Sequence, residues 1–172
     1  SEAEVSFLDS IRKLFGVRSF NIILVFFCIL GMANWLNPNR QGVDGKWPAN
    51  YLDSVYRSGD WKNAWQAFRY LNRKGVEPYF NVSGIVPQQW NRKGTLELEN
   101  FDAYAEMVAS MADWARNVEK LKFSMLAPFN ETDLGGYREG PSILPQNRKA
   151  ALDAIIQKLD EHHLGDLKLI VF

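Results

Sequence analysis

Short apolar runs alternate with amphipathic segments of helical length along the whole chain, and this alternation constrains the fold more than any other feature. The apolar runs are rich in β-branched and aromatic residues, which predicts buried strands over residues 22–30, 76–85, 123–129 and 167–172. The segments with apolar residues at every third or fourth position predict helices over residues 1–16, 61–73, 101–121 and 146–162. Strands joined by helix-length connections form parallel sheets, so the sequence predicts an α/β fold with residues 1–172 in a single domain.

The charge balance bears on the partners that the protein can bind. Twenty basic and twenty acidic side chains give a formal net charge of +0. Nucleic-acid-binding domains carry a basic excess that offsets the phosphates, so we expect no nucleic-acid partner.

Because Cys28 is the only cysteine, no disulfide forms within the chain, and cysteine usage leaves an extracellular or a cytoplasmic location open. We expect no cofactor. We also expect no metal, because His162 and His163 lie at the C-terminus of a predicted helix, where imidazole interacts favourably with the helix dipole.

Residues 20–36 allow two interpretations. No charged residue lies between Arg18 and Arg40, and the apolar stretch is dense in β-branched and aromatic residues. The first interpretation, which we favour, is a buried parallel strand. The second is a signal anchor, with basic residues before the apolar stretch and small residues after it. The stretch is short for a membrane span, so we expect no membrane association.

Residues 37–59 are rich in Asn, Gly and Pro, and this composition predicts a loop. The loop is long for a simple connection and contains Trp47, Tyr51 and Tyr56. We therefore expect it to form the wall of a pocket.

Polar or aromatic residues follow three successive predicted strands. The clearest case is residues 122–136, where an apolar run leads into Asn130, Glu131, Thr132 and Asp133 and then into two glycines. The carboxyl ends of parallel strands meet at one edge of a sheet, where a carboxylate can act as a general acid or base. The residues expected at this edge are Asn34, Trp35, Asn81, Trp90, Asn130 and Glu131.

The sequence Phe129-Asn130-Glu131 at a strand end, preceded by the turn from Pro87 to Trp90 after the previous strand, resembles a known family. It is similar to the fourth and third strands of the (β/α)8-barrel retaining glycoside hydrolases of clan A, of the β-xylosidase, glucosylceramidase and endo-galactanase kind. The resemblance implies a partial TIM barrel that acts on an oligo- or polysaccharide. It implies that Glu131 is the general acid/base and that Asn130 binds the 2-hydroxyl of the sugar. Trp90 and Trp35 would line the sugar subsites, with Asn81 and Asn34 as further contacts.

The chain departs from the family in length and in its carboxylates. A complete barrel has eight strands and about 250 residues, whereas the sequence predicts four strands. The nucleophilic Glu that a retaining enzyme needs about 5 Å from the acid/base has no counterpart here, so we expect no turnover by this chain alone. The open edges of half a barrel predict self-association. The alternatives are a non-catalytic carbohydrate-binding or scaffold module, and a membrane-anchored remnant held by residues 20–36.

Overall fold

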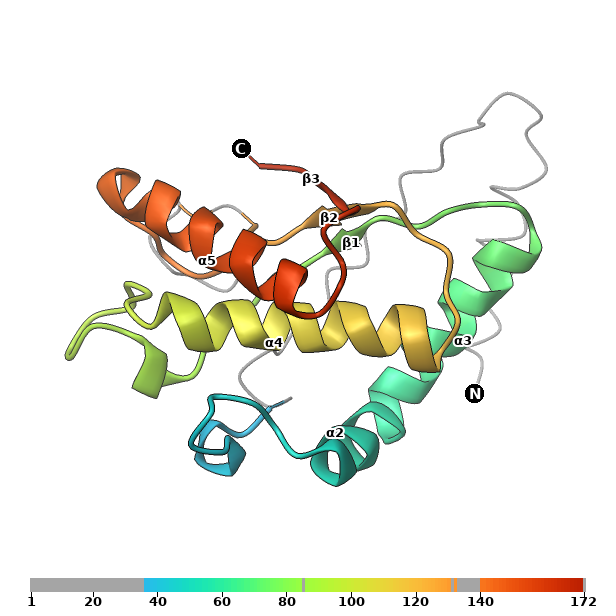
Figure 1. Ribbon diagram of the computed structural model, residues 1–172, viewed down its shortest axis with the longest axis horizontal. Coiled ribbons are helices and arrows are strands. Elements are labelled where there is room, and N and C mark those ends of the chain that lie inside the picture. Colours follow the sequence, from blue (N-terminus) through green and yellow to red (C-terminus); the bar gives the residue numbers. More distant parts are fainter. Residues whose placement is uncertain (1–35, 85, 131, 133–139, 172) are drawn as a thin grey trace, which may run out of the picture.

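The computed structural model describes residues 36–84, 86–130, 132 and 140–171 (Figure 1). Its helices are α2 (Ala49–Tyr56), α3 (Gly59–Arg73), α4 (Phe101–Asp113) and α5 (Arg148–Glu161), and its strands are β1 (Phe80–Asn81), β2 (Met125–Ala127) and β3 (Lys168–Leu169). The predicted helix over residues 1–16 and the predicted strand over residues 22–30, with Cys28, lie outside the described residues. The helices predicted over 61–73 and 146–162 are confirmed within two residues at each end.

The three strands form a parallel sheet in the order β1-β2-β3. Phe80 pairs with Leu126, Asn81 with Ala127, and Leu126 with Leu169. Because each strand lies beside the next one in the chain, both crossovers run in the same direction, and their usual right-handedness places α4 and α5 on one face of the sheet. Figure 1 shows both helices on the same side of the three strands. The predicted α/β character and the parallel strands are therefore confirmed for the described part of the chain.

The strands are shorter than the sequence predicts, and two prolines account for part of the difference. Pro78 and Pro128 have no N–H group to donate to a strand ladder. The first lies before the start of β1, and the second follows the last residue of β2. Hydrogen bonding between the first two strands nevertheless continues one residue beyond β1, because the Val82 N–H donates to the carbonyl of Ala127 at 2.9 Å.

Helix α4 begins as predicted but ends earlier. The side chain of Asn100 accepts a hydrogen bond from the Ala103 N–H at 3.1 Å and caps the helix. The α-helix stops at Asp113 and continues as a wider π-helical turn over Trp114–Val118. This change of helix type alters which residues face inward. Val118 continues the apolar positions of the helix predicted over residues 101–121 and was therefore expected to be buried, but it is 43% exposed.

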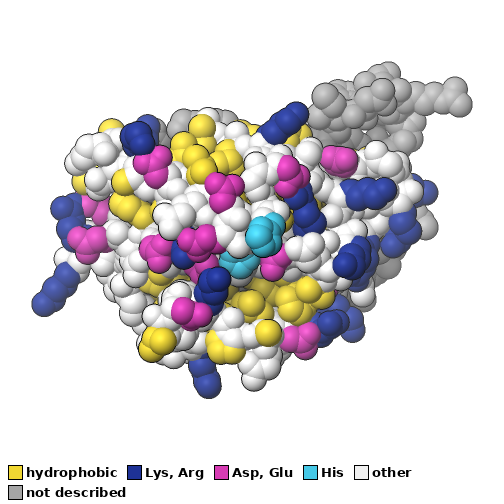
Figure 2. Space-filling model, in the orientation of Figure 1, with side chains coloured by type: hydrophobic (Ala, Val, Ile, Leu, Met, Phe, Trp, Pro, Cys, Tyr) yellow, Lys and Arg dark blue, Asp and Glu magenta, His cyan; other side chains and the backbone are white. Residues whose placement is uncertain are grey.

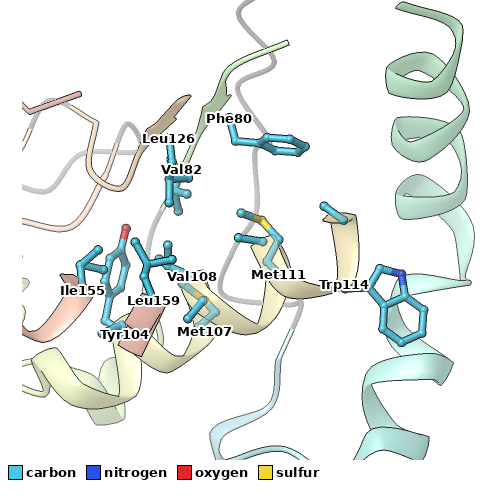
Figure 3. Packing of buried hydrophobic residues seen from close by; sticks show 14 of the residues in the cluster. Phe80, Val82, Tyr104, Met107, Val108, Met111, Trp114, Leu126, Ile155 and Leu159 are labelled. Carbon is cyan, nitrogen blue, oxygen red and sulfur yellow. The ribbon is translucent and has the colours of Figure 1, made fainter. Parts of the chain in front are cut away.

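The hydrophobic core lies between the sheet and the helices, with α4 at its centre. Figure 3 shows Phe80 and Leu126 from the strands, and Val82 directly after β1, opposite Tyr104, Val108 and Met111 from α4. Ile155 and Leu159 of α5 lie beside them. Phe68 of α3 extends this core, since its ring lies 4.7 Å from that of Phe80. Side chains alternate along a strand, so Asn81 points away from the helices.

The prediction of a loop over residues 37–59 is wrong, because α2 forms within it. Pro48 precedes the first helical residue with a φ of −58°, a value already suited to a helix start. Tyr56, at the end of α2, is buried against Trp61 and Trp114, and the Trp65 indole donates to the Tyr56 carbonyl at 2.9 Å. Trp47 is also buried in the core. Trp47 and Tyr56 therefore contribute to the core instead of lining a pocket.

The second interpretation of residues 20–36 rests almost entirely on residues outside the described part. Among the helices of residues 36–171 that the structure describes, none combines the length and the apolar character needed to cross a membrane.

Candidate functional site

The carboxyl ends of β1 and β2 bring together two of the predicted site residues. The Asn81 side chain donates from Nδ2 to Oδ1 of Asn130 at 2.8 Å, although 49 residues separate the two positions. Asn81 is buried, whereas Asn130 is half-buried. The parallel register places both residues at the same edge of the sheet.

Helix α4 holds the segment after β2 in place. The Tyr104 hydroxyl donates to the Pro128 carbonyl at 2.7 Å, and the Tyr104 ring stacks on that of Phe129 with centroids 5.6 Å apart. Burial raises the pKa of Tyr104 above its usual value, so the hydroxyl stays protonated and remains a donor. These contacts fix the backbone directly before Asn130.

Gly140 packs directly against the backbone of Asn130. A Cβ atom at position 140 would lie 1.9 Å from the Asn130 carbonyl oxygen, so no larger residue fits without a shift. The segments after β1 and β2 are joined as well, because the Leu98 N–H donates to the Ser142 carbonyl at 2.8 Å. Within the segment after β2, the Ile143 N–H donates to the Thr132 carbonyl at 3.1 Å. These contacts stabilise the carboxyl edge of the sheet through the segments that follow β1 and β2.

Trp90 is placed near this edge, but its side chain is in the core. Its indole is 2% exposed and lies edge-on to Trp47 at a centroid distance of 6.2 Å. Its carbonyl accepts hydrogen bonds from the N–H groups of Glu99 and Asn100 at the start of α4. Stacking on a sugar stays a prediction for Trp90, and it would require the indole to become exposed.

All five described tryptophans, Trp90 included, are buried in the core. Each is at most 8% exposed: Trp47, Trp61, Trp65, Trp90 and Trp114. The high aromatic content is thus explained by packing in the part of the chain that the structure describes.

Three predicted site residues lie outside the described part of the chain, namely Asn34, Trp35 and Glu131. Glu131 follows Asn130 directly in the sequence.

A charged cluster between α4 and α5 was not predicted from the sequence. The Nε2 atom of His162 lies 3.0 Å from Oε1 of Glu106, and its Nδ1 atom lies 3.7 Å from Oδ2 of Asp113. Lys158 lies nearby, with its Nζ atom 3.0 Å from Glu161 Oε2 and 3.9 Å from Glu106 Oε2. Figure 2 shows the histidine side chains among acidic and basic ones on this face of the molecule. The only sequence signal for this cluster was a glutamate in the apolar part of the predicted helix.

The surroundings of His162 set its protonation. The hydrogen bond to Glu106 raises the pKa of His162 above its usual value, against the opposing effect of burial. The cluster lies on the helical side of the sheet, away from Asn81. The described residues contain no group of three or more His, Cys, Asp or Glu side chains arranged to hold a metal ion. We therefore treat the cluster as part of the structure and the strand edge as the candidate site.

Comparison of the chain with known protein families and with curated proteins gives no match.

Proposed function

We propose that the chain is part of a retaining β-glycosidase barrel that binds an oligo- or polysaccharide at the carboxyl edge of its sheet. The hydrogen bond between Asn81 and Asn130 carries the proposal. It places two amide side chains at the ends of adjacent parallel strands, where (β/α)8 barrels hold their active sites. Amides both donate and accept hydrogen bonds, as sugar hydroxyls do.

The order of the strands supports a partial barrel. Neighbouring strands β1, β2 and β3 follow one another in the chain, with both crossover helices on one face. A doubly wound sheet needs a reversal of strand order, with helices on both faces. The described strands contain no such reversal, and repetition of the same step is how a barrel closes.

The proposed mechanism assigns the proton transfers to Glu131. This carboxyl group would protonate the leaving oxygen and then take a proton from the water that releases the glycosyl-enzyme. Asn130 would hold the neighbouring hydroxyl. The nucleophilic carboxylate would come from outside these 172 residues, so the chain itself should bind sugar without hydrolysing it.

Calorimetric titration with xylobiose, cellobiose and β-1,4-galactobiose tests this proposal. The wild-type chain should bind at least one of them, and Asn130→Ala should weaken that binding about tenfold through the loss of amide hydrogen bonds. Asn117→Ala is a matched control, because Asn117 lies in the π-helical turn that follows the last residue of α4. Absence of binding by the wild type at millimolar sugar would overturn the proposal.

A second experiment separates an enzyme from a binding module. In a longer chain that supplies the nucleophile, Glu131→Gln should abolish turnover of unactivated substrates and preserve sugar binding. Unchanged turnover would remove Glu131 from the mechanism. Binding without turnover in the longer chain would favour the non-catalytic carbohydrate-binding module.

A further inference from the structure

Buried oxygens without hydrogen-bond partners are concentrated at the end of β1 and in the segment that follows it. Four side-chain oxygens in the described part of the chain are buried and unpaired, and three of them belong to Asn81, Ser83 and Asn91. The fourth, Oε2 of Glu106, has the ammonium group of Lys158 3.9 Å away. Unpaired buried oxygens destabilise a fold, so their grouping within 11 residues of one strand end calls for an explanation.

Ser83 is the most informative of the three. Its side chain is completely buried, and its Oγ atom has no hydrogen-bond partner. By contrast, the hydroxyl of Ser110, which is also buried, donates to the Met107 carbonyl at 3.0 Å. A serine hydroxyl rotates freely and usually finds a backbone carbonyl in this way. Ser83 does not, although burial favours such a bond.

Ser83 continues the line of polar groups that begins at the candidate site. Val82 faces the helices, as Figure 3 shows, so the alternation along an extended chain places Asn81 and Ser83 on the opposite face. Asn81 is joined to the half-buried Asn130 by its side-chain hydrogen bond. The half-buried Asn130, the buried Asn81 and the buried Ser83 are therefore all placed at the carboxyl end of the sheet, with Asn81 and Ser83 on the same face of their strand.

We propose that Ser83, together with Asn81, binds hydroxyl groups of the saccharide, and that the unpaired Ser83 Oγ and Asn81 Oδ1 atoms gain their partners from the ligand. This inference rests on the proposed function and extends it to a residue that the sequence did not single out for binding. Asn81 Oδ1 only accepts hydrogen bonds, whereas Ser83 Oγ both donates and accepts. A polyhydroxyl ligand satisfies both atoms, and an apolar ligand satisfies neither.

The test combines affinity with thermal stability in the 172-residue chain, using Ser83→Ala and the control Ser110→Ala. Titration with xylobiose, cellobiose and β-1,4-galactobiose should show about fivefold weaker binding for Ser83→Ala, as expected for one lost hydrogen bond. The melting temperature of the same variant should rise by about 3 °C, because an unpaired buried hydroxyl has been removed. Ser110→Ala should keep the wild-type affinity and should not gain stability through this effect.

The outcomes distinguish the two proposals. If the wild type binds sugar and Ser83→Ala binds equally well, this inference is overturned and the proposed function stands. A lower melting temperature for Ser83→Ala would identify a structural partner of the hydroxyl and would also overturn it. If the wild type binds none of the three sugars, the proposed function fails, and the role of Ser83 fails with it.

Discussion

His162 Nε2 and Glu106 Oε1 lie 3.0 Å apart and join the end of α5 to the middle of α4. The Glu106 side chain is 3% exposed and that of His162 is 15% exposed, so water screens this pair weakly. The second ring nitrogen of His162 faces Asp113 at 3.7 Å. A protonated imidazole donates from both nitrogens, and here each nitrogen faces a carboxylate. The geometry therefore favours the charged form of His162 in the folded protein.

We predict that the stability of the protein falls as the pH rises above about 6.5, the ordinary pKa of histidine. The hydrogen bond to Glu106 raises the pKa of His162 in the folded state. A raised pKa contributes stability that is complete below the unfolded value of about 6.5 and is lost as the pH rises through the folded pKa. Melting temperatures measured across this range should decline for the wild type, and the decline should be smaller for His162→Gln.

His163→Asn is the matched control for this pH dependence. His163 is exposed and has a φ of 58°, a backbone conformation that asparagine tolerates. This variant should keep the wild-type slope. Equal slopes for the wild type and His162→Gln would show that the pair with Glu106 does not couple folding to protons.

Replacing Glu106 by alanine should destabilise the fold by about 2–4 kcal/mol. The change creates a cavity between α4 and α5 and removes a carboxylate partner of both His162 and Lys158. Urea denaturation followed by circular dichroism measures the loss as a lower midpoint. The exposed Glu99 provides the comparison, since Glu99→Ala should change stability by no more than about 0.5 kcal/mol. A similar small effect at position 106 would contradict the prediction.

Gly140→Ala should disturb the candidate site through the backbone of Asn130. The new Cβ would lie 1.9 Å from the Asn130 carbonyl oxygen, and this contact involves backbone that cannot rotate away. Overpacking of this kind costs about 1–3 kcal/mol, and sugar affinity should fall together with stability. Gly42→Ala is a milder change, because its nearest neighbour is the flexible carboxylate of Asp44. Wild-type affinity in Gly140→Ala would show that the position of Asn130 is unimportant for binding.

The sequence predicted the elements well where side-chain periodicity decides the structure. The predicted apolar positions of α3 are buried from Trp61 to Leu71 except for the half-buried Ala64. Those from Tyr104 to Ala115, in α4 and the π-helical turn after it, are buried as expected. The error at Val118 arose because a π-helical turn does not follow the 3.6-residue period. The sequence did not predict helix α2, because the many Asn, Gly and Pro residues around it favour a loop and its apolar pattern is short. Proline is common at helix starts, so Pro48 was a signal for this helix.

The candidate site could be predicted in its location but not in its contacts. Strand-end asparagines at positions 81 and 130 indicated the edge of the sheet, and the parallel register brings them together. Their hydrogen bond depends on side-chain directions that no linear pattern specifies. The burial of Trp90 and the unpaired hydroxyl of Ser83 depend on long-range packing in the same way. The pair of Glu106 and His162 joins positions 56 residues apart, and its only sequence signal was the glutamate within the apolar part of the predicted helix.

A double-mutant cycle on Asn81 and Asn130 should give a coupling energy of about 0.5–1.5 kcal/mol. The two side chains share one hydrogen bond at 2.8 Å, so removing the second partner should cost less once the first is gone. Urea denaturation of Asn81→Ala, Asn130→Ala and the double variant measures this coupling. The combination of Asn81→Ala with Asn117→Ala should be additive, because these residues share no partner and Asn117 bonds to Asp113 instead. Additivity of the Asn81 and Asn130 variants would mean that the strand ends are held by the backbone alone, and the amide pair would then be available in full to a ligand.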